Sequence, residues 1–172
     1  MEQFVVSARK YRPQAFEAVV GQSHITDTLL KSVENDHLAQ ALLFCGPRGV
    51  GKTTCARILA KVINAGANLS DDELALNIFE LDAASNNSVD DIRRLIDQVR
   101  FAPQTGKFKV YIIDEVHMLS QQAFNAFLKT LEEPPAHAIF ILATTEKHKI
   151  IPTILSRCQI FDFKRITVQH IA

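Results

Sequence analysis

The stretch ALLFCGPRGVGKT at residues 41–53 decides the fold, because a strongly apolar run leads directly into a glycine-rich pattern. Residues 46–53 match G-x-x-x-x-G-K-[ST], and an alanine-rich stretch of helical character, TCARILAKVI, follows them. Such glycines allow successive backbone N–H groups to face a polyphosphate, and the N-terminus of the following helix adds partial positive charge. The sequence therefore predicts a strand, a phosphate-binding loop and a helix in succession. A chance glycine-rich turn is the alternative.

Two side chains of this loop have the chemistry to handle the phosphates and their metal ion. Lys52 would reach the β- and γ-phosphates, and the Thr53 hydroxyl would ligate Mg²⁺. The other contacts would come from the loop and from the first residues of the helix. The predicted nucleotide contacts here are Gly46, Pro47, Arg48, Gly49, Val50, Gly51, Lys52, Thr53 and Thr54.

Strand and helix patterns alternate along the rest of the chain. Besides residues 41–45, apolar runs predict strands at residues 77–82, 108–114, 138–144 and 159–163. Amphipathic patterns predict helices before the first strand, after the second and after the third, at residues 25–33, 89–99 and 120–131. Ser88 with Asp91 can cap the second of these helices, and Ser120 can cap the third, which the prolines at 134–135 stop. This order predicts an α/β fold, a five-stranded and mainly parallel sheet flanked by helices, with ligands at the carboxyl ends of the strands.

Acidic and hydroxyl side chains stand at the ends of two of these strands. Asp114 leaves the third strand on the same sheet edge as the loop, where a carboxylate can ligate Mg²⁺. Glu115 follows and can orient and deprotonate a water for in-line attack on a γ-phosphate, although a helix-capping pair of acids is the alternative. His117 either joins a network around Glu115 or is a packed or solvated histidine. At the end of the fourth strand, a hydroxyl of Thr144 or Thr145 can hold the attacking water or sense the γ-phosphate, but threonine is also common in strands.

Composition limits the remaining possibilities. Lys and Arg total 19, as do Asp and Glu, so the net charge of zero gives no global signal for nucleic acid or membrane binding. The longest apolar runs are far shorter than the ~20 residues that a bilayer requires, and the first ten residues lack the apolar core of a signal peptide. We therefore expect a cytoplasmic protein without membrane contact. The three cysteines lie in or beside apolar segments without paired spacing, which favours reduced thiols over disulfides or metal ligands.

Together, these segments resemble the AAA+ ATPase core and, more closely, the clamp-loader ATPase family of the bacterial DNA polymerase III gamma/tau type. The matching stretches are ARKYRPQAFEAVVGQ (8–22), GPRGVGKT (46–53), ELDAASNNSVDDIR (80–93), GKFKVYIIDEVHMLS (106–120), FNAFLKTLEEPP (124–135), ILATTE (141–146) and ILSRC (154–158). The resemblance covers nearly the whole chain and implies a P-loop ATPase that uses ATP and Mg²⁺ to load a sliding clamp onto primed DNA in replication. It also implies other clamp-loader subunits, in a hetero-pentamer, as partners, together with the sliding clamp and the primer-template DNA backbone.

The resemblance gives a role to Arg157, an arginine between two apolar stretches with no partner beside it in the sequence. In this family, the arginine of the SRC triplet acts in trans on the γ-phosphate bound by the neighbouring subunit. An arginine finger contributes about 10³- to 10⁵-fold in rate, so the isolated domain is expected to bind ATP and hydrolyse it slowly. A surface arginine without a role is the alternative. The predicted catalytic set is therefore Lys52, Glu115, Thr145 and, in trans, Arg157.

Two further contact sets are implied by the resemblance alone. The adenine pocket would be formed by Arg9, Tyr11, Pro13, Val19, Val20 and Gln22, although these positions could equally belong to the core. The segment SNNS at residues 85–88 opens the helix that carries Arg93 and Arg94, and could offer donors to the DNA backbone. A plain helix cap with solvated arginines explains that segment equally well.

The chain departs from the family at two places. The family usually carries a four-cysteine zinc module between the P-loop helix and the second strand, whereas the polar segment at residues 64–76 contains no cysteine, so no zinc is expected there. The chain also stops near the point where the family's helical lid domain should begin. We therefore expect residues 1–172 to form the AAA+ nucleotide-binding domain alone, without the lid and its sensor arginine.

Three other functions remain open. A non-catalytic structural subunit of the loader would contribute only its finger, but the intact P-loop and acidic pair argue against it. A helicase would need a second motor lobe, for which 172 residues leave no room. Another AAA+ DNA remodeller, such as a branch-migration motor, would be distinguished by turnover that does not depend on a clamp and primed DNA.

Overall fold

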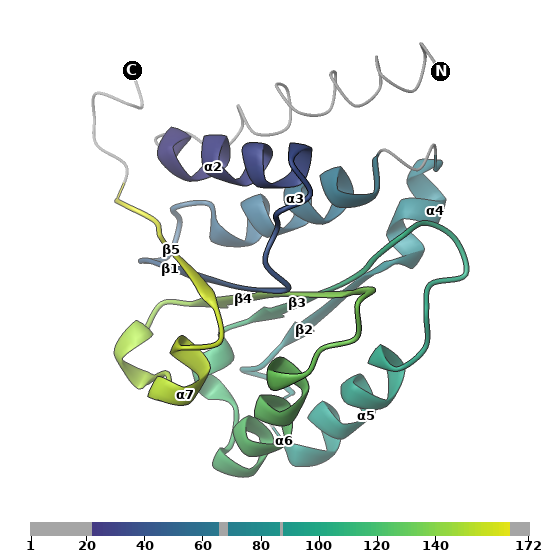
Figure 1. The fold of residues 1–172 in the computed structure, drawn as a ribbon. Helices are drawn as coiled ribbons and strands as arrows, with labels where there is room; N and C mark the ends of the chain where they lie inside the picture. Colours follow the sequence, from purple (N-terminus) through teal and green to yellow (C-terminus); the bar gives the residue numbers. More distant parts are fainter. Residues whose placement is uncertain (1–21, 66–68, 87, 166–172) are drawn as a thin grey trace.

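The computed structural model describes residues 22–65, 69–86 and 88–165, and within them five strands form one parallel sheet (Figure 1). The strands are β1 (Ala41–Cys45), β2 (Ile78–Asp82), β3 (Lys109–Asp114), β4 (Ala138–Thr144) and β5 (Gln159–Asp162). Their order across the sheet is β2-β3-β4-β1-β5. The predicted five-stranded sheet is therefore confirmed, and all of its pairings are parallel.

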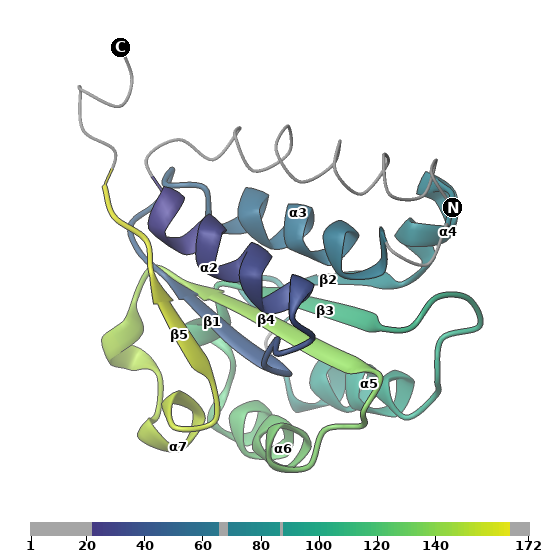
Figure 2. The same cartoon turned by 45° about the horizontal axis from the view of Figure 1, so that its top comes forward.

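Helices cover both faces of the sheet, as Figures 1 and 2 show. On one face lie α2 (Ser23–Glu34) and α3 (Lys52–Ala65), and on the other lie α5 (Val89–Val99) and α6 (Gln121–Glu132). The shorter elements are α4 (Asp71–Leu76), α7 (Pro152–Leu155) and the 3₁₀ turns η1 (Val116–Met118) and η2 (Lys147–Lys149). In the described ranges, no helix is both long and apolar enough to cross a membrane.

Two apolar cores, one on each face, explain why the central strands read as unbroken apolar runs. Successive side chains of a strand point to opposite faces, so Leu42 and Phe44 pack in the core under α2 and α3, while Leu43 and Cys45 pack in the core under α5 and α6. Every residue of β1 and β4 is buried. Strands covered on both faces cannot alternate apolar with polar residues, which accounts for ALLFC and AIFILAT.

Local capping chemistry fixes where the helices begin. Ser88 forms a capping box with Asp91 at the start of α5, and the Ser120 hydroxyl accepts a hydrogen bond from Ala123 N at the start of α6, so both predicted caps are confirmed. In the segment that showed no clear periodicity, α4 begins in the same way, with Ser70 accepting from Glu73 N. The short pattern S-x-x-E was the available signal for that helix.

The strand register brings the functional segments to one edge of the sheet. Cys45 pairs with Thr144, and Asp82 pairs with Asp114. The loop after β1, the acidic pair after β3 and the threonines that end β4 therefore emerge side by side. This is the edge at which ligands of open parallel sheets bind.

Candidate functional site

The loop between β1 and α3 has the backbone of a phosphate-binding loop. Gly46, Gly49 and Gly51 all have positive φ angles, of 153°, 79° and 96°, which residues with a side chain rarely adopt. A side chain at Gly46 would also have no room, because a Cβ atom there would lie 2.7 Å from the carbonyl oxygen of Phe163. Since α3 begins at Lys52, the N–H groups of its first turn are directed toward the loop.

Lys52 is buried between the loop and the acidic pair. Its Nζ donates hydrogen bonds to the carbonyl oxygens of Gly46 at 2.6 Å and Pro47 at 2.7 Å. An ammonium has three donors, so one is left for a phosphate oxygen. Burial lowers the pKa of Lys52, and the nearby carboxylates of Glu115 and Asp114 oppose that shift. A bound phosphate would add further negative charge that favours the protonated form.

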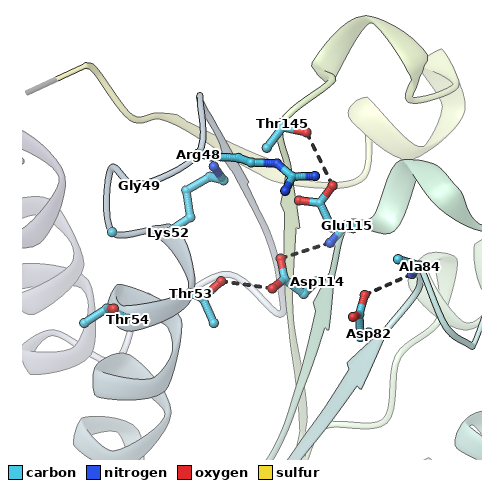
Figure 3. A pocket seen from close by; sticks show the side chains of 11 residues that line it. Arg48, Gly49, Lys52, Thr53, Thr54, Asp82, Ala84, Asp114, Glu115 and Thr145 are labelled. Atoms are coloured by element: carbon cyan, nitrogen blue, oxygen red, sulfur yellow. Dashed lines mark hydrogen bonds between the residues drawn. The ribbon is translucent and has the colours of Figure 1, made fainter.

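Thr53 and Asp114 are the residues that would hold a magnesium ion. The Thr53 hydroxyl donates to Asp114 Oδ2 at 3.1 Å, and Asp114 Oδ1 accepts a hydrogen bond from Glu115 N at 3.0 Å (Figure 3). Adjacent ligands of an octahedral Mg²⁺ with bonds of 2.0–2.1 Å lie about 2.9 Å apart. The separation and the hard oxygen donors therefore both fit Mg²⁺.

These groups surround a pocket of about 460 Å³, within the roughly 300–1,000 Å³ range of small-molecule sites. Its lining is Arg48, Gly49, Gly51, Lys52, Thr53, Thr54, Asp82, Ala84, Asp114, Glu115 and Thr145. The side chains carry two cationic groups and three carboxylates, so their formal charge is −1. A polyphosphate would be repelled by that charge, and a divalent cation reverses its sign. The pocket thus suits a metal-bound nucleotide better than a bare one.

Asp82 is a lining residue that the sequence reasoning did not identify. It ends β2 as Asp114 ends β3, and its Oδ1 accepts a hydrogen bond from Ala84 N at 2.9 Å (Figure 3). The signal was present, because an acidic residue at the carboxyl end of an apolar strand faces the same sheet edge in both cases.

Glu115 and Thr145 meet at the pocket, whereas Thr144 does not reach it. Thr145 Oγ1 donates to Glu115 Oε2 at 3.4 Å, and both residues line the cavity (Figure 3). Thr144 is fully buried and pairs instead with Nδ1 of His117 at 2.8 Å. Of the two threonines that the sequence left open, Thr145 is the one that lines the pocket. His117 is buried in a network with Glu115, which resolves the alternatives for that residue.

Several predicted contact residues lie elsewhere. Gly46 and Pro47 line a neighbouring hollow, and the Val50 side chain belongs to the core under α2 and α3. Gln22 is buried, and its amide is used by the protein: it donates to Val50 O at 3.4 Å and Lys164 O at 2.6 Å, and accepts from Lys164 N at 3.1 Å. This side chain ties the loop to the segment after β5. The other predicted adenine contacts, Arg9, Tyr11, Pro13, Val19 and Val20, lie outside the described residues.

The predicted intersubunit and DNA-contacting arginines all lie at the surface. Arg157 follows α7 and is absent from the described lining of the phosphate pocket, and its side chain forms an ion pair at 3.5 Å with Glu132, the last residue of α6. Arg93 and Arg94 pair loosely with Asp90 and Asp91 one turn earlier, at 3.9 and 3.8 Å. The start of α5, with its capping box and these pairs, has the features of a plain helix cap with solvated arginines.

The fold and the site together define a class, the AAA+ P-loop NTPase core. The RuvB Holliday junction branch migration motor of Thermotoga maritima superposes with a TM-score of 0.69 at 22% identity, over 94% of this chain and 51% of that one, which bears on the fold alone. A DNA polymerase III gamma subunit-related protein from the same organism gives a TM-score of 0.62 at 25% identity, over 82% of this chain and 47% of that one. Such a fold implies the use of a nucleotide and Mg²⁺.

Within that class, residues 21–167 match the family model described as DNA polymerase III, delta subunit, and the chain belongs to this family of DNA polymerase III subunits. It is 55% identical over 177 residues to the tau subunit of DNA polymerase III from Bacillus subtilis, covering 95% of this chain and 31% of that subunit. The Escherichia coli tau subunit is 46% identical over 98% of this chain and 28% of its own length. The gamma subunit of Buchnera aphidicola subsp. Baizongia pistaciae is 44% identical over 96% of this chain and 48% of its length. The predicted resemblance to gamma/tau subunits is confirmed, and the chain spans between about a quarter and a half of these relatives.

Proposed function

We propose that this chain is the ATP-binding and ATP-hydrolysing domain of a DNA polymerase III clamp-loader subunit. The observation that carries the proposal is the convergence of Lys52, Thr53, Asp114 and Glu115 on one pocket at the carboxyl edge of the sheet. The chain would act with other loader subunits, in a hetero-pentamer, on a sliding clamp and primer-template DNA. Residues 1–172 would supply the nucleotide-binding domain of that subunit.

The residues around the pocket have distinct roles in this mechanism. The loop N–H groups and Lys52 bind the phosphates of ATP, while Thr53 and Asp114 hold Mg²⁺. When bound, the ion neutralises charge that develops on the phosphate oxygens. Glu115 accepts a proton from the attacking water, and the Thr145 hydroxyl, which donates to Glu115 Oε2, helps to fix that carboxylate.

Arg157 is proposed to complete the site of a neighbouring subunit. Its side chain is about half exposed and lies outside the chain's own pocket, so it is accessible to another molecule. The pocket's own formal charge is negative, and an added guanidinium would oppose the charge that builds up on the γ-phosphate. Turnover would then be a property of the assembly, and the isolated chain would hydrolyse ATP slowly.

A mixing experiment tests this function. Wild type, Arg157→Ala and Glu115→Gln are assayed for ATP hydrolysis and ATP binding over a range of chain concentrations. We expect wild-type turnover per chain to rise with concentration, both variants to bind ATP with little turnover, and their mixture to regain activity. Arg100→Ala is the matched control, because Arg100 is also an exposed arginine in a loose ion pair, with Asp97 at 4.0 Å.

Two results would contradict the proposal at different levels. If the wild type binds no ATP, the proposed ATPase activity is wrong, and a non-catalytic structural subunit is favoured. The role of Arg157 in trans would be contradicted by either of two results. One is turnover per chain that does not depend on concentration, and the other is a mixture that stays inactive although both variants bind ATP. With partner subunits present, stimulation by clamp and primed DNA would distinguish a clamp loader from another AAA+ DNA remodeller.

A further inference from the structure

His117 lies beside the pocket in a buried polar chain to which the mechanism above gives no role. Its side chain is only 5% exposed. Nδ1 lies 2.8 Å from Thr144 Oγ1, and Nε2 lies 3.5 Å from Glu115 Oε2. Both ring nitrogens therefore have a polar partner, as a buried imidazole requires. One of these partners is the carboxylate to which we assign the role of general base.

The bonds of Thr144 determine which nitrogen carries the proton in the neutral ring. Thr144 Oγ1 already accepts a hydrogen bond from Glu146 N at 2.9 Å, and its own proton is available for donation. If the hydroxyl donates to Nδ1, then Nε2 is protonated and its N–H faces the Glu115 carboxylate. The opposite tautomer would place a nitrogen lone pair against a carboxylate oxygen, which is repulsive. The arrangement that satisfies every partner therefore has the proton on Nε2.

This tautomer makes the two oxygens of Glu115 unequal. Oε2 faces two donors, Nε2–H of His117 at 3.5 Å and the Thr145 hydroxyl at 3.4 Å. In the described part of the chain, no protein hydrogen bond is recorded to Oε1. A carboxylate held at one oxygen retains its other oxygen for a proton from water.

The backbone after β3 makes this contact possible. Glu115 has a left-handed conformation, with φ of 51° and ψ of 46°, and the chain then turns through η1, where Met118 N donates to Glu115 O at 2.9 Å. Glu115 is not glycine, so its left-handed backbone must be held by its surroundings. The turn returns His117 toward the end of β4, where Thr144 is fully buried. The histidine thus lies between the ends of two buried central strands, β3 and β4.

We propose that His117 is a positioning residue that holds Glu115 Oε2, so that Oε1 accepts the proton of the attacking water. This inference rests on the proposed ATP hydrolysis. In that step, the water oxygen forms a bond to the γ-phosphorus, the bond from that phosphorus to the β,γ-bridging oxygen breaks, and ADP leaves with the electron pair. The water proton goes to Oε1, while Thr145 keeps its hydrogen bond to Oε2 and His117 Nε2 keeps its contact with that oxygen.

The first test reads the tautomer without relying on turnover. Long-range ¹H–¹⁵N spectra of the 172-residue chain report which imidazole nitrogen is protonated, and the spectrum of His117→Gln assigns the signal. We expect a proton on Nε2 in the wild type. In Thr144→Val, which removes the hydroxyl while keeping a similar shape, the preference should weaken but not invert, because the Glu115 carboxylate still faces Nε2. A proton on Nδ1 in the wild type would overturn the proposal.

The second test is a double-mutant cycle of ATP hydrolysis with excess enzyme. We expect His117→Phe to slow hydrolysis about 10- to 100-fold, the cost of a misplaced catalytic group, while the Kd for ATP stays within about twofold. His117→Gln, whose amide can donate in place of Nε2–H, should recover most of the rate. Because His117 acts through Glu115, His117→Phe should have no further effect in Glu115→Gln.

The outcomes separate this inference from the function on which it rests. An unchanged rate in His117→Phe, or an equal slowing with and without Glu115, would overturn the positioning role alone. A rate loss accompanied by weaker ATP binding or by a lower thermal midpoint, without recovery in His117→Gln, would assign the residue to packing and overturn the role as well. If the wild type does not hydrolyse ATP, the proposed function is wrong, and the positioning role of His117 is wrong as well.

Discussion

Alanine is expected to be far more damaging at Gly46 than at Gly49, although both glycines belong to the same loop. Both have a positive φ, 153° at Gly46 and 79° at Gly49. Their surroundings differ. A Cβ at Gly46 would lie 2.7 Å from the carbonyl oxygen and 2.9 Å from the Cβ of Phe163, whereas a Cβ at Gly49 would meet nothing within 4 Å. The pair therefore separates backbone strain from steric conflict.

The magnitudes follow from those two terms. A side-chain-bearing residue with a positive φ costs about 1–2 kcal/mol, and we expect Gly49→Ala to lose that much free energy of unfolding. At Gly46, the atoms that would have to move belong to backbone that is itself fixed, because Phe163 N donates to Cys45 O at 2.6 Å. Overpacking of this kind costs a further 1–3 kcal/mol or so, which gives about 2–5 kcal/mol for Gly46→Ala.

Urea unfolding followed by far-UV circular dichroism measures both variants, since the chain contains no tryptophan for fluorescence. The midpoint should fall further for Gly46→Ala, with an unchanged dependence on urea concentration. If the two variants lost the same free energy of unfolding within error, the close approach of the loop to the segment after β5 would not affect stability. The steric reasoning would then be wrong.

Three further changes test other parts of the structure. Asp114→Asn, which keeps the hydrogen bond from Thr53 possible but removes a charge, should weaken Mg²⁺-dependent nucleotide binding by about tenfold or more while leaving Mg²⁺-free binding similar or tighter, as measured by calorimetry. Burial raises the pKa of the Cys55 thiol from 9.0 to about 12, so the unfolded chain releases this proton at a lower pH than the folded chain does. The free energy of unfolding should therefore fall as the pH rises above about 9. In urea titrations, Cys55→Ala should lose less free energy of unfolding between pH 9 and 11 than the wild type does. Gln22→Leu removes two donated bonds and one accepted bond, and should lower the free energy of unfolding by about 2–4 kcal/mol.

The parts of the fold that could be predicted from sequence are those under the strictest physical constraint. Strands buried on both faces must be apolar throughout, so β1 and β4 were predicted with the bounds that the structure gives them. The loop after β1 is constrained by glycine conformations and by spacing, which its sequence pattern records directly. Asp114 was found for a related reason, because the end of a buried strand is one of the few places where an acidic side chain can follow an apolar run.

The features that could not be predicted from the sequence depend on contacts between segments that are distant in sequence. Nothing near Gln22 in the sequence indicates that its amide will join the phosphate loop to Lys164, 142 positions later. The difference between Thr144 and Thr145 arises because one side chain packs inward against His117 while the other reaches the cavity. Periodicity alone does not reveal where a strand stops and its alternation ends. Such partners become visible only once the packing of η1 against β4 is known.

Arg157 raises the question of whether its pair with Glu132 would oppose a role at a neighbour's phosphate. The two side chains are 49% and 43% exposed and 3.5 Å apart, and exposed pairs of this kind contribute about 0–1 kcal/mol. An arginine finger that accelerates hydrolysis about 10³- to 10⁵-fold stabilises the transition state by roughly 4–7 kcal/mol. The second quantity exceeds the first severalfold. The contact with Glu132 therefore gives Arg157 a preferred direction in the free chain, but it is too weak to prevent a move to a phosphate across an interface.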